Sequence, residues 1–296
     1  FEYWIEQGVK IFRVDNPHTK PFVFWEWLIG ELKSRYPEVI LLSEAFTRPK
    51  VMHQLAKLGF TQSYTYFTWR NSKWEIEEYL QELCHHPSRE YFIPNLWPNT
   101  PDILHAYLQT GGRPAFIVRF ILAATAGSNY GIYGPAFELC VNTPLKPGSE
   151  EYLNSEKYEI KYWDLNAPHS LKPLISLVNR IRKENPALHK MDNLRIYRID
   201  NPLMVVYGKR TGGGDSGTDR RHFGENIVIV ALNLDPHYTQ SGWVEIPVED
   251  IGVSPDQTYW VHDLLTGNRY PWKGSHNYIE LNPHHLPAHI FRVEKE

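Results

Sequence analysis

The sequence predicts an α/β domain with a parallel sheet, followed by an all-β domain with antiparallel strands. Up to Glu184, short β-branched runs alternate with helical patterns, which is typical of βαβ units. From Leu194 onward, strand patterns follow one another with turns between them, as in a β-sandwich. Of the 296 residues, 42% are hydrophobic, so the chain can bury a core and is not disordered.

The first region opens with the last turns of a helix, closed by Gly8 as a C-terminal cap. Five buried-strand patterns follow, at Val9–Val14, Val39–Leu42, Thr61–Phe67, Tyr91–Trp97 and Asn129–Tyr133. Helical spacing lies between and after them, at Phe22–Tyr36, Pro49–Leu58, Trp74–Leu83, Leu104–Gln109, Pro114–Ala126 and Leu171–Glu184.

A closed parallel barrel needs eight strands, and an open sheet of five would leave its first strand uncovered. This region is therefore either a complete doubly wound sheet or the C-terminal part of a (β/α)8 barrel, with about five βα units. A start in the middle of a helix favours the barrel, with three further βα units before Phe1.

The second region contains only strand candidates, which predict an antiparallel sandwich. They are Leu194–Ile199, Met204–Lys209, Ile227–Asn233, Gly242–Ile246, Thr258–Asp263, Tyr278–Leu281 and His289–Val293. Thr211–Gly217 is glycine-rich and predicts a flexible hairpin loop. We place the two domains at 1–191 and 192–296.

Composition excludes several classes of protein. A net charge of −3 argues against a nucleic-acid binder, and the run Ala115–Ala126, interrupted by Arg119, is too short to span a membrane. Cys84 and Cys140 are predicted to be reduced thiols of a cytoplasmic protein. Neither cysteine nor histidine spacing suggests a metal site, and we expect no cofactor. Aromatic residues make up 14% of the chain; they fill cores first, but they also stack on sugars.

Three carboxylates follow predicted strands. Asp15 and Glu44 come directly after the first two strands, and Asp102 follows the fourth. They are 29 and 58 residues apart, which fits one and two βα units. Functional groups of parallel α/β folds gather at the carboxyl ends of strands, so these acids could meet. Two facing carboxyl groups can carry out acetal chemistry, in which one attacks or stabilises and the other donates a proton. A single Asp after a strand, however, is about as often a helix cap.

Arg13 lies two residues before Asp15, so both side chains point to the same face of the strand. A guanidinium beside Asp15 would keep that carboxylate ionised, as a nucleophile requires. We expect Glu44 to be buried away from Arg13, with a raised pKa suited to a general acid. A purely structural ion pair is the alternative.

The residues Phe12-Arg13-Val14-Asp15, Ser43-Glu44-Ala45 and Pro101-Asp102 resemble the three catalytic segments of the α-amylase superfamily, in the same order. The match is closer to the branch of maltosyltransferases that extend α-1,4-glucans from α-maltose 1-phosphate. The strings that carry it are FRVDNPHTKP (12–21), LSEAFTRP (42–49), SYTYFTWRN (63–71), NTPDILHAYLQ (99–109), SEKYE (155–159) and VALNLDPHYTQ (230–240).

The resemblance implies a retaining double displacement, with Asp15 as nucleophile, Glu44 as general acid/base and Asp102 as stabiliser of the transition state. The carboxyl groups of a retaining pair lie ~5–5.5 Å apart. It also implies that the Asn16 amide binds phosphate, and that Lys157 and Tyr158 contact the maltosyl unit. The alternatives are a turn-forming Asn before Pro17 and an ordinary solvated surface. Pro101 stands where hydrolases usually carry His, which argues against simple amylase activity.

The implied partners are maltose 1-phosphate and α-1,4-glucan. We expect the chain to need the upstream half of its own barrel, and to be inactive or barely active alone. Two alternatives remain open: an α-glucan hydrolase of the same superfamily, and a non-catalytic glucan-binding subunit. A homodimer is compatible with the sequence, and a role of the β-domain in dimerisation or glucan binding stays open.

Overall fold

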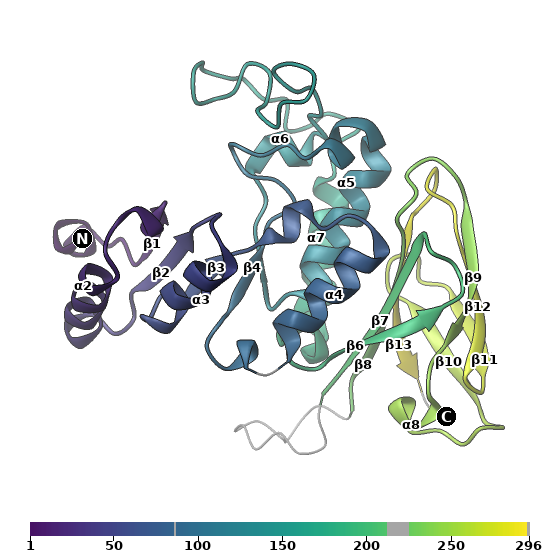
Figure 1. The fold of residues 1–296 in the computed structure, drawn as a ribbon. Helices are drawn as coiled ribbons and strands as arrows, with labels where there is room; N and C mark the ends of the chain where they lie inside the picture. Colours follow the sequence, from purple (N-terminus) through teal and green to yellow (C-terminus); the bar gives the residue numbers. More distant parts are fainter. Residues whose placement is uncertain (86, 212–224, 295–296) are drawn as a thin grey trace.

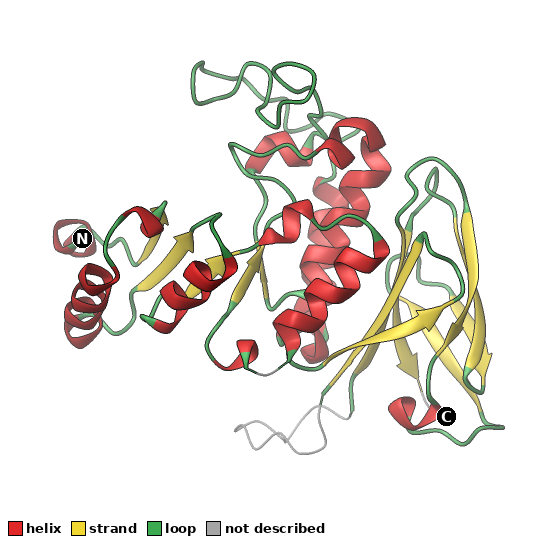
Figure 2. Ribbon diagram, in the orientation of Figure 1, coloured by secondary structure: helices red, strands yellow, loops and turns green. Residues whose placement is uncertain are grey.

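The structure is a computed structural model that describes residues 1–85, 87–211 and 225–294. Its first part holds five parallel strands in the order β1-β2-β3-β4-β5, joined by helices (Figures 1 and 2). The strands are β1 (Ile11–Asp15), β2 (Ile40–Glu44), β3 (Gln62–Tyr64), β4 (Pro94–Leu96) and β5 (Asn129–Tyr130). Sequential parallel pairing places the carboxyl ends of all five strands along one edge of the sheet.

The helices of this part are α1 (Glu2–Glu6), α2 (Phe22–Arg35), α3 (Pro49–Lys57), α4 (Lys73–Cys84), α5 (Ala106–Ala126), α6 (Gly134–Glu138) and α7 (Lys172–Glu184). α4 begins at a capping box, in which Ser72 and Glu75 satisfy each other's backbone N–H groups. α5 joins the two predicted helices 104–109 and 114–126 across a kink at Gly112, whose φ of 55° favours glycine. Pro114, just after it, accounts for the break.

The second part is an antiparallel sheet of eight strands in the order β11-β10-β13-β8-β7-β6-β9-β12. The strands are β6 (Leu194–Ile199), β7 (Met204–Arg210), β8 (Ile227–Asn233), β9 (Gln240–Glu245), β10 (Thr258–Asp263), β11 (Arg269–Lys273), β12 (His276–Leu281) and β13 (Ala288–Glu294), with a short helix α8 (Val248–Ile251). The sheet curls around its own core, which joins residues of both ends such as Val244 of β9 and Val261 of β10.

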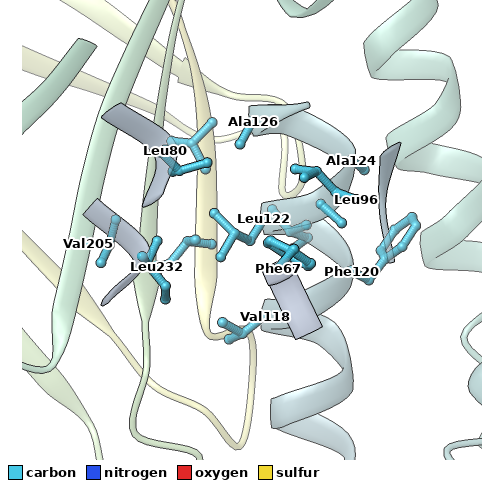
Figure 3. Packing of buried hydrophobic residues seen from close by; sticks show 14 of the residues in the cluster. Phe67, Leu80, Leu96, Val118, Phe120, Leu122, Ala124, Ala126, Val205 and Leu232 are labelled. Carbon is cyan, nitrogen blue, oxygen red and sulfur yellow. The ribbon is translucent and has the colours of Figure 1, made fainter. Parts of the chain in front are cut away.

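A single hydrophobic cluster connects the two parts (Figure 3). Leu122 and Phe120 of α5 and Leu96 of β4 pack in it with Val205 and Leu232 of the antiparallel sheet. The buried end of α5 is closed by two basic side chains. Arg182 donates to the carbonyls of Gly127 and Ser128, and Lys209 donates to those of Thr125 and Ala126 at 3.2 and 3.0 Å. Cations are favourable at this end of the helix dipole.

The predicted strand Thr61–Phe67 is shorter in the structure. β3 ends at Tyr64, and a 3-10 helix, Tyr66–Trp69, follows it. Its turn is fixed by Thr65, whose hydroxyl accepts from the N–H of Phe67, and by buried Arg119, which donates to the carbonyls of Phe67 and Arg70. The Arg119 contacts come from 49 and 52 residues further along the chain, so a distant side chain helps to override local strand propensity here.

The sequence did not predict β11, which contains Pro271. Proline lacks the N–H that a central strand needs, and β11 lies at the edge of its sheet, where proline is tolerated. The predicted loop Thr211–Gly217 lies, beyond Thr211, outside the described residues.

Candidate active site

Asp15 and Glu44 occupy equivalent ends of neighbouring strands. β1 and β2 are parallel, and Asp15 is paired in register with Glu44. The N–H of Asn16 donates to the carbonyl of Glu44 at 3.0 Å, which ties the two strand ends together just beyond the pair. Asp15 is 64% exposed and Glu44 only 7%, so the two carboxyl groups sit in different environments.

Arg13 binds both acids at once. Its Nη2 lies 2.8 Å from Glu44 Oε1, and its Nη1 lies 3.5 Å from Asp15 Oδ2. Our expectation that Glu44 would lie away from Arg13 is therefore wrong, because register pairing brings Glu44 onto the same face as Arg13. Burial nevertheless raises the pKa of Glu44, and the attraction of Arg13 works against that rise. The charge of Asp15 also favours protonated Glu44.

Asp102 follows β4, which is two strands away from β2. Its turn is held by Thr100, whose hydroxyl accepts from the Asp102 N–H at 3.2 Å. Fully buried Asn99 anchors the segment by donating to the Tyr152 hydroxyl at 2.7 Å and accepting from the N–H of Tyr133 at 2.9 Å. Asp102 shares the carboxyl-terminal edge with the other two acids, but in the described chain it makes neither an ion pair nor a hydrogen bond with them.

The partner of Asp102 is Lys157. The Lys157 Nζ forms an ion pair with Asp102 Oδ1 and lies 3.7 Å from Glu151. The hydrogen bond to Asp102 raises the pKa of Lys157. Tyr158 is 75% exposed, and Lys157 Nζ lies 5.6 Å from the centre of its ring. The structure thus places Lys157 against the third acid and Tyr158 near Lys157, an arrangement that their sequence positions alone could not indicate.

Asn16 has left-handed backbone angles, with φ at 46° and ψ at 51°. It precedes the 3-10 helix Pro17–Thr19, and its carbonyl accepts from the N–H and hydroxyl of Thr19. The backbone of Asn16 therefore forms a turn before Pro17, as the alternative interpretation of this residue expected. Its side chain is exposed at the carboxyl end of β1, so a role in ligand binding is compatible with the turn.

Two aromatic residues at this edge were missed by sequence reasoning. Tyr64 ends β3, and Trp97 comes directly after β4; their rings are stacked at 4.9 Å. Tyr64 is 6% exposed and lies against Arg13, which lowers its pKa, although burial raises that pKa more strongly. Trp97 Nε1 is buried and has no hydrogen-bond partner within the described ranges. Alternation along β1, which puts Arg13 and Asp15 on one face, was visible in the sequence. The register of β2 and β3, which adds Tyr64 to that face, was not.

Gly131 leaves the space that the Trp97 ring fills. A Cβ built at Gly131 would lie 2.2 Å from this ring, so Gly131→Ala is expected to displace Trp97 and lower the free energy of unfolding by about 1–3 kcal/mol. Urea unfolding measures the change. Gly30→Ala is the matched control, because a Cβ there has open space within α2 and is expected to stabilise by up to about 1 kcal/mol. Equal effects of the two substitutions would contradict the packing argument.

Other kinds of site find little support in the part of the chain that is described. No group of three or more His, Cys, Asp or Glu side chains there could hold a metal ion. Cys84 and Cys140 are both free thiols. None of the described helices combines the length and hydropathy needed to cross a bilayer.

Comparison with known proteins identifies relatives of the whole chain. Residues 196–293 match the family described as "GLGE, C-terminal". The chain is 53% identical to an α-1,4-glucan:maltose-1-phosphate maltosyltransferase of Chlorobaculum tepidum and 51% identical to one of Methylacidiphilum infernorum. These alignments cover 99% and 100% of the chain, but 43% of each relative. The resemblance that the motifs indicated is confirmed, and the chain spans less than half the length of these relatives.

Solved structures share the fold. An α-amylase of Geobacillus thermoleovorans, complexed with acarbose, matches with a TM-score of 0.70 at 14% identity, over 100% of this chain and 62% of the amylase. An Anoxybacillus α-amylase matches with a TM-score of 0.72, also at 14% identity, over 99% of this chain and 61% of that one. The likeness confirms the predicted fold class: the C-terminal part of a (β/α)8 barrel followed by an antiparallel β-domain.

Proposed function

We propose that this chain, which resembles α-1,4-glucan:maltose-1-phosphate maltosyltransferases over its whole length, carries the acidic residues of a retaining maltosyltransferase. The reaction moves a maltosyl unit from α-maltose 1-phosphate to the non-reducing end of an α-1,4-glucan and releases phosphate. The observation that carries the proposal is the pairing of Asp15 with Glu44 across two parallel strands, with Arg13 bound to both.

The different surroundings of the two acids support different roles. In the proposed first step, the exposed Asp15 carboxylate attacks the anomeric carbon, the bond from that carbon to the phosphate oxygen breaks, and phosphate leaves with the bonding electrons. Glu44, whose pKa burial raises, assists by donating a proton. In the second step the 4-hydroxyl of a glucan end attacks, Glu44 takes its proton, and Asp15 is released.

Further residues fit the sugar and phosphate. We assign Asp102 to stabilising the transition state, Lys157 and Tyr158 to contacts with the maltosyl unit, and Asn16 to the phosphate. The buried, unpartnered indole N–H of half-buried Trp97 supports a polar ligand at this edge, because buried donors normally have a partner. The ~5–5.5 Å separation of a retaining pair stays a prediction for Asp15 and Glu44.

The proposal concerns a longer protein that contains this chain, called here the full-length protein. The chain aligns with 43% of its relatives, and three further βα units would complete the barrel. We propose that they supply the remaining phosphate and sugar contacts. We also propose a domain division at 191/192, a cytoplasmic location and a homodimer.

One assay separates the proposed function from its rivals. Full-length protein is incubated with maltose 1-phosphate and glycogen, and free phosphate and reducing sugar are measured in parallel. Maltosyl transfer releases phosphate without new reducing ends, whereas a hydrolase produces reducing sugar and a binding subunit produces neither. The 296-residue chain alone is expected to release phosphate far more slowly; rates equal to the full-length protein would contradict the need for an upstream half.

A further inference from the structure

One turn of the chain carries both residues that the proposed function assigns to the maltosyl unit. Lys157 and Tyr158 lie in the long loop between α6 and α7, which extends beyond α6 (Figure 1). Ser155 starts the turn and is only 6% exposed. Its carbonyl accepts from the N–H groups of Tyr158 and Glu159 at 2.9 and 3.2 Å, and its hydroxyl accepts from the N–H of Lys157 at 3.3 Å. These bonds shape the turn, but they do not tie it to the sheet.

The side chain of Glu156 makes that connection. Its Oε2 accepts from the Tyr133 hydroxyl at 2.5 Å, and its Oε1 accepts from the Trp163 indole N–H at 2.8 Å. Tyr133 lies just beyond β5, and Trp163 lies seven residues after Glu156 in the loop. The two hydrogen bonds lower the pKa of Glu156, so it accepts as a carboxylate at neutral pH, and bonds to a charged acceptor are the stronger kind.

The other end of this connection is fixed close to the third acid. The backbone N–H of Tyr133 donates to Asn99 Oδ1 at 2.9 Å. Asn99 is fully buried and comes three residues before Asp102. The path from Asn99 through Tyr133 to Glu156 therefore links the segment of Asp102 to the turn that carries Lys157.

We propose that Glu156 is a positioning residue for maltosyl transfer, which holds Lys157 and Tyr158 in place through its bonds to Tyr133 and Trp163. The inference rests on the proposed function, which assigns Lys157 and Tyr158 to the maltosyl unit. Glu156 acts through the turn and need not touch the substrate.

The ion pair between Lys157 and Asp102 does not fix the turn by itself. The two side chains are 39% and 43% exposed, and water and salt weaken an ion pair with that much exposure. Asp102 is also assigned to the transition state, so its carboxylate must face the sugar when substrate binds. The bonds of Glu156 do not involve Asp102, so they can hold Lys157 while its ion pair gives way to the sugar.

A neighbouring carboxylate in the same turn has no such connection to the sheet among its described contacts. Glu159 forms an ion pair with Lys161 at 3.3 Å, and its side chain is 48% exposed. This pair joins two residues of one loop, whereas the Glu156 carboxylate reaches the end of β5. Glu159 is therefore the matched control for Glu156.

The test measures steady-state kinetics of full-length protein with maltose 1-phosphate. Glu156→Ala removes both bonds, and we expect KM for maltose 1-phosphate to rise about tenfold while kcat stays within about twofold. Lys157 and Tyr158 contact the maltosyl unit in the ground state and the transition state alike, so their displacement weakens binding more than chemistry. Tyr133→Phe removes one bond, keeps the ring and should raise KM about threefold. Glu159→Ala should behave as wild type.

Two further variants separate positioning from a general effect on the fold. In protein that already carries Lys157→Ala and Tyr158→Ala, adding Glu156→Ala should change KM by less than about twofold, because the contacts that it supports are gone. Glu156→Gln should stay within about threefold of the wild-type KM, because the amide oxygen accepts from Trp163 and the amide N–H can donate to the Tyr133 hydroxyl.

Three results would overturn the proposal. These are an unchanged KM in Glu156→Ala, an equal rise in Glu159→Ala, and a full tenfold rise in the background that lacks Lys157 and Tyr158. If Glu156→Ala fails to fold, Tyr133→Phe and Glu156→Gln decide the question by the values given above. A KM that is insensitive to loss of Lys157 and Tyr158 would overturn their assignment and this inference together, whereas a sensitive one with unchanged Glu156→Ala would overturn the inference alone.

Discussion

Asp15→Asn in the full-length protein is expected to lower the rate of maltosyl transfer by at least about 10⁴-fold. The amide cannot act as the nucleophile, so the bond to phosphate does not break in the first step. The substitution keeps the size of the side chain, and Asp15 is 64% exposed, so the fold should be unaffected. Phosphate release from maltose 1-phosphate in a single turnover measures this step directly.

Glu44→Gln provides the contrast that separates the two roles. Phosphate is a good leaving group, so the first step needs little proton donation, whereas the glucan hydroxyl needs a base in the second. We expect the steady-state rate to fall about 10²–10⁴-fold while a burst of one phosphate per enzyme remains. Asp256→Asn, an exposed Asp on the β-domain, is the control and should behave as wild type. A burst in Asp15→Asn, or none in Glu44→Gln, would reverse or refute the assignment.

Lys209→Met is expected to change how stability depends on pH. Burial lowers the pKa of Lys209 from 10.5 to about 7, while its ammonium donates only to the carbonyls of Thr125 and Ala126 among the contacts described. Between pH 7 and 10.5 the unfolded chain therefore holds a proton that the folded protein has released. The free energy of unfolding therefore rises with pH across that window because of Lys209. Below pH 7 the folded protein bears the full destabilisation of a buried charged ammonium.

The expected size follows from one proton. Each pH unit contributes about 1.4 kcal/mol, so from pH 7 to 9 the free energy of unfolding of wild type should gain about 2–3 kcal/mol relative to Lys209→Met. Urea unfolding at several pH values measures the difference, in which the buried tyrosines common to both proteins cancel. Lys273→Met, at an exposed position on β11, should remain parallel to wild type. Parallel curves for Lys209→Met would show that this lysine does not titrate in the window.

Much of the fold followed from periodicity. The β-branched run Val9–Val14 and the helical spacing of Leu171–Glu184 predicted β1 and α7 within a few residues. The misses have a common cause, which is that the deciding contacts are distant in sequence. Arg119 bends the chain after β3 from 49 and 52 residues away, and the edge position of β11 makes Pro271 acceptable. Neither fact is visible in a local window.

The placement of acids after strands, at spacings of one and two βα units, was determined by the sequence itself, because parallel strands must share an edge. Whether these acids touch was decided only by the tertiary structure. The strand register pairs Asp15 with Glu44, and Arg13 forms an ion pair with each of them. Asp102 instead binds Lys157, which lies 55 residues further along the chain. Burial decided the rest: it separates Glu44 from Asp15 in exposure and leaves Tyr64 only 6% exposed near Arg13 and Glu44. Burial depends on neighbours in space, which a sequence does not name.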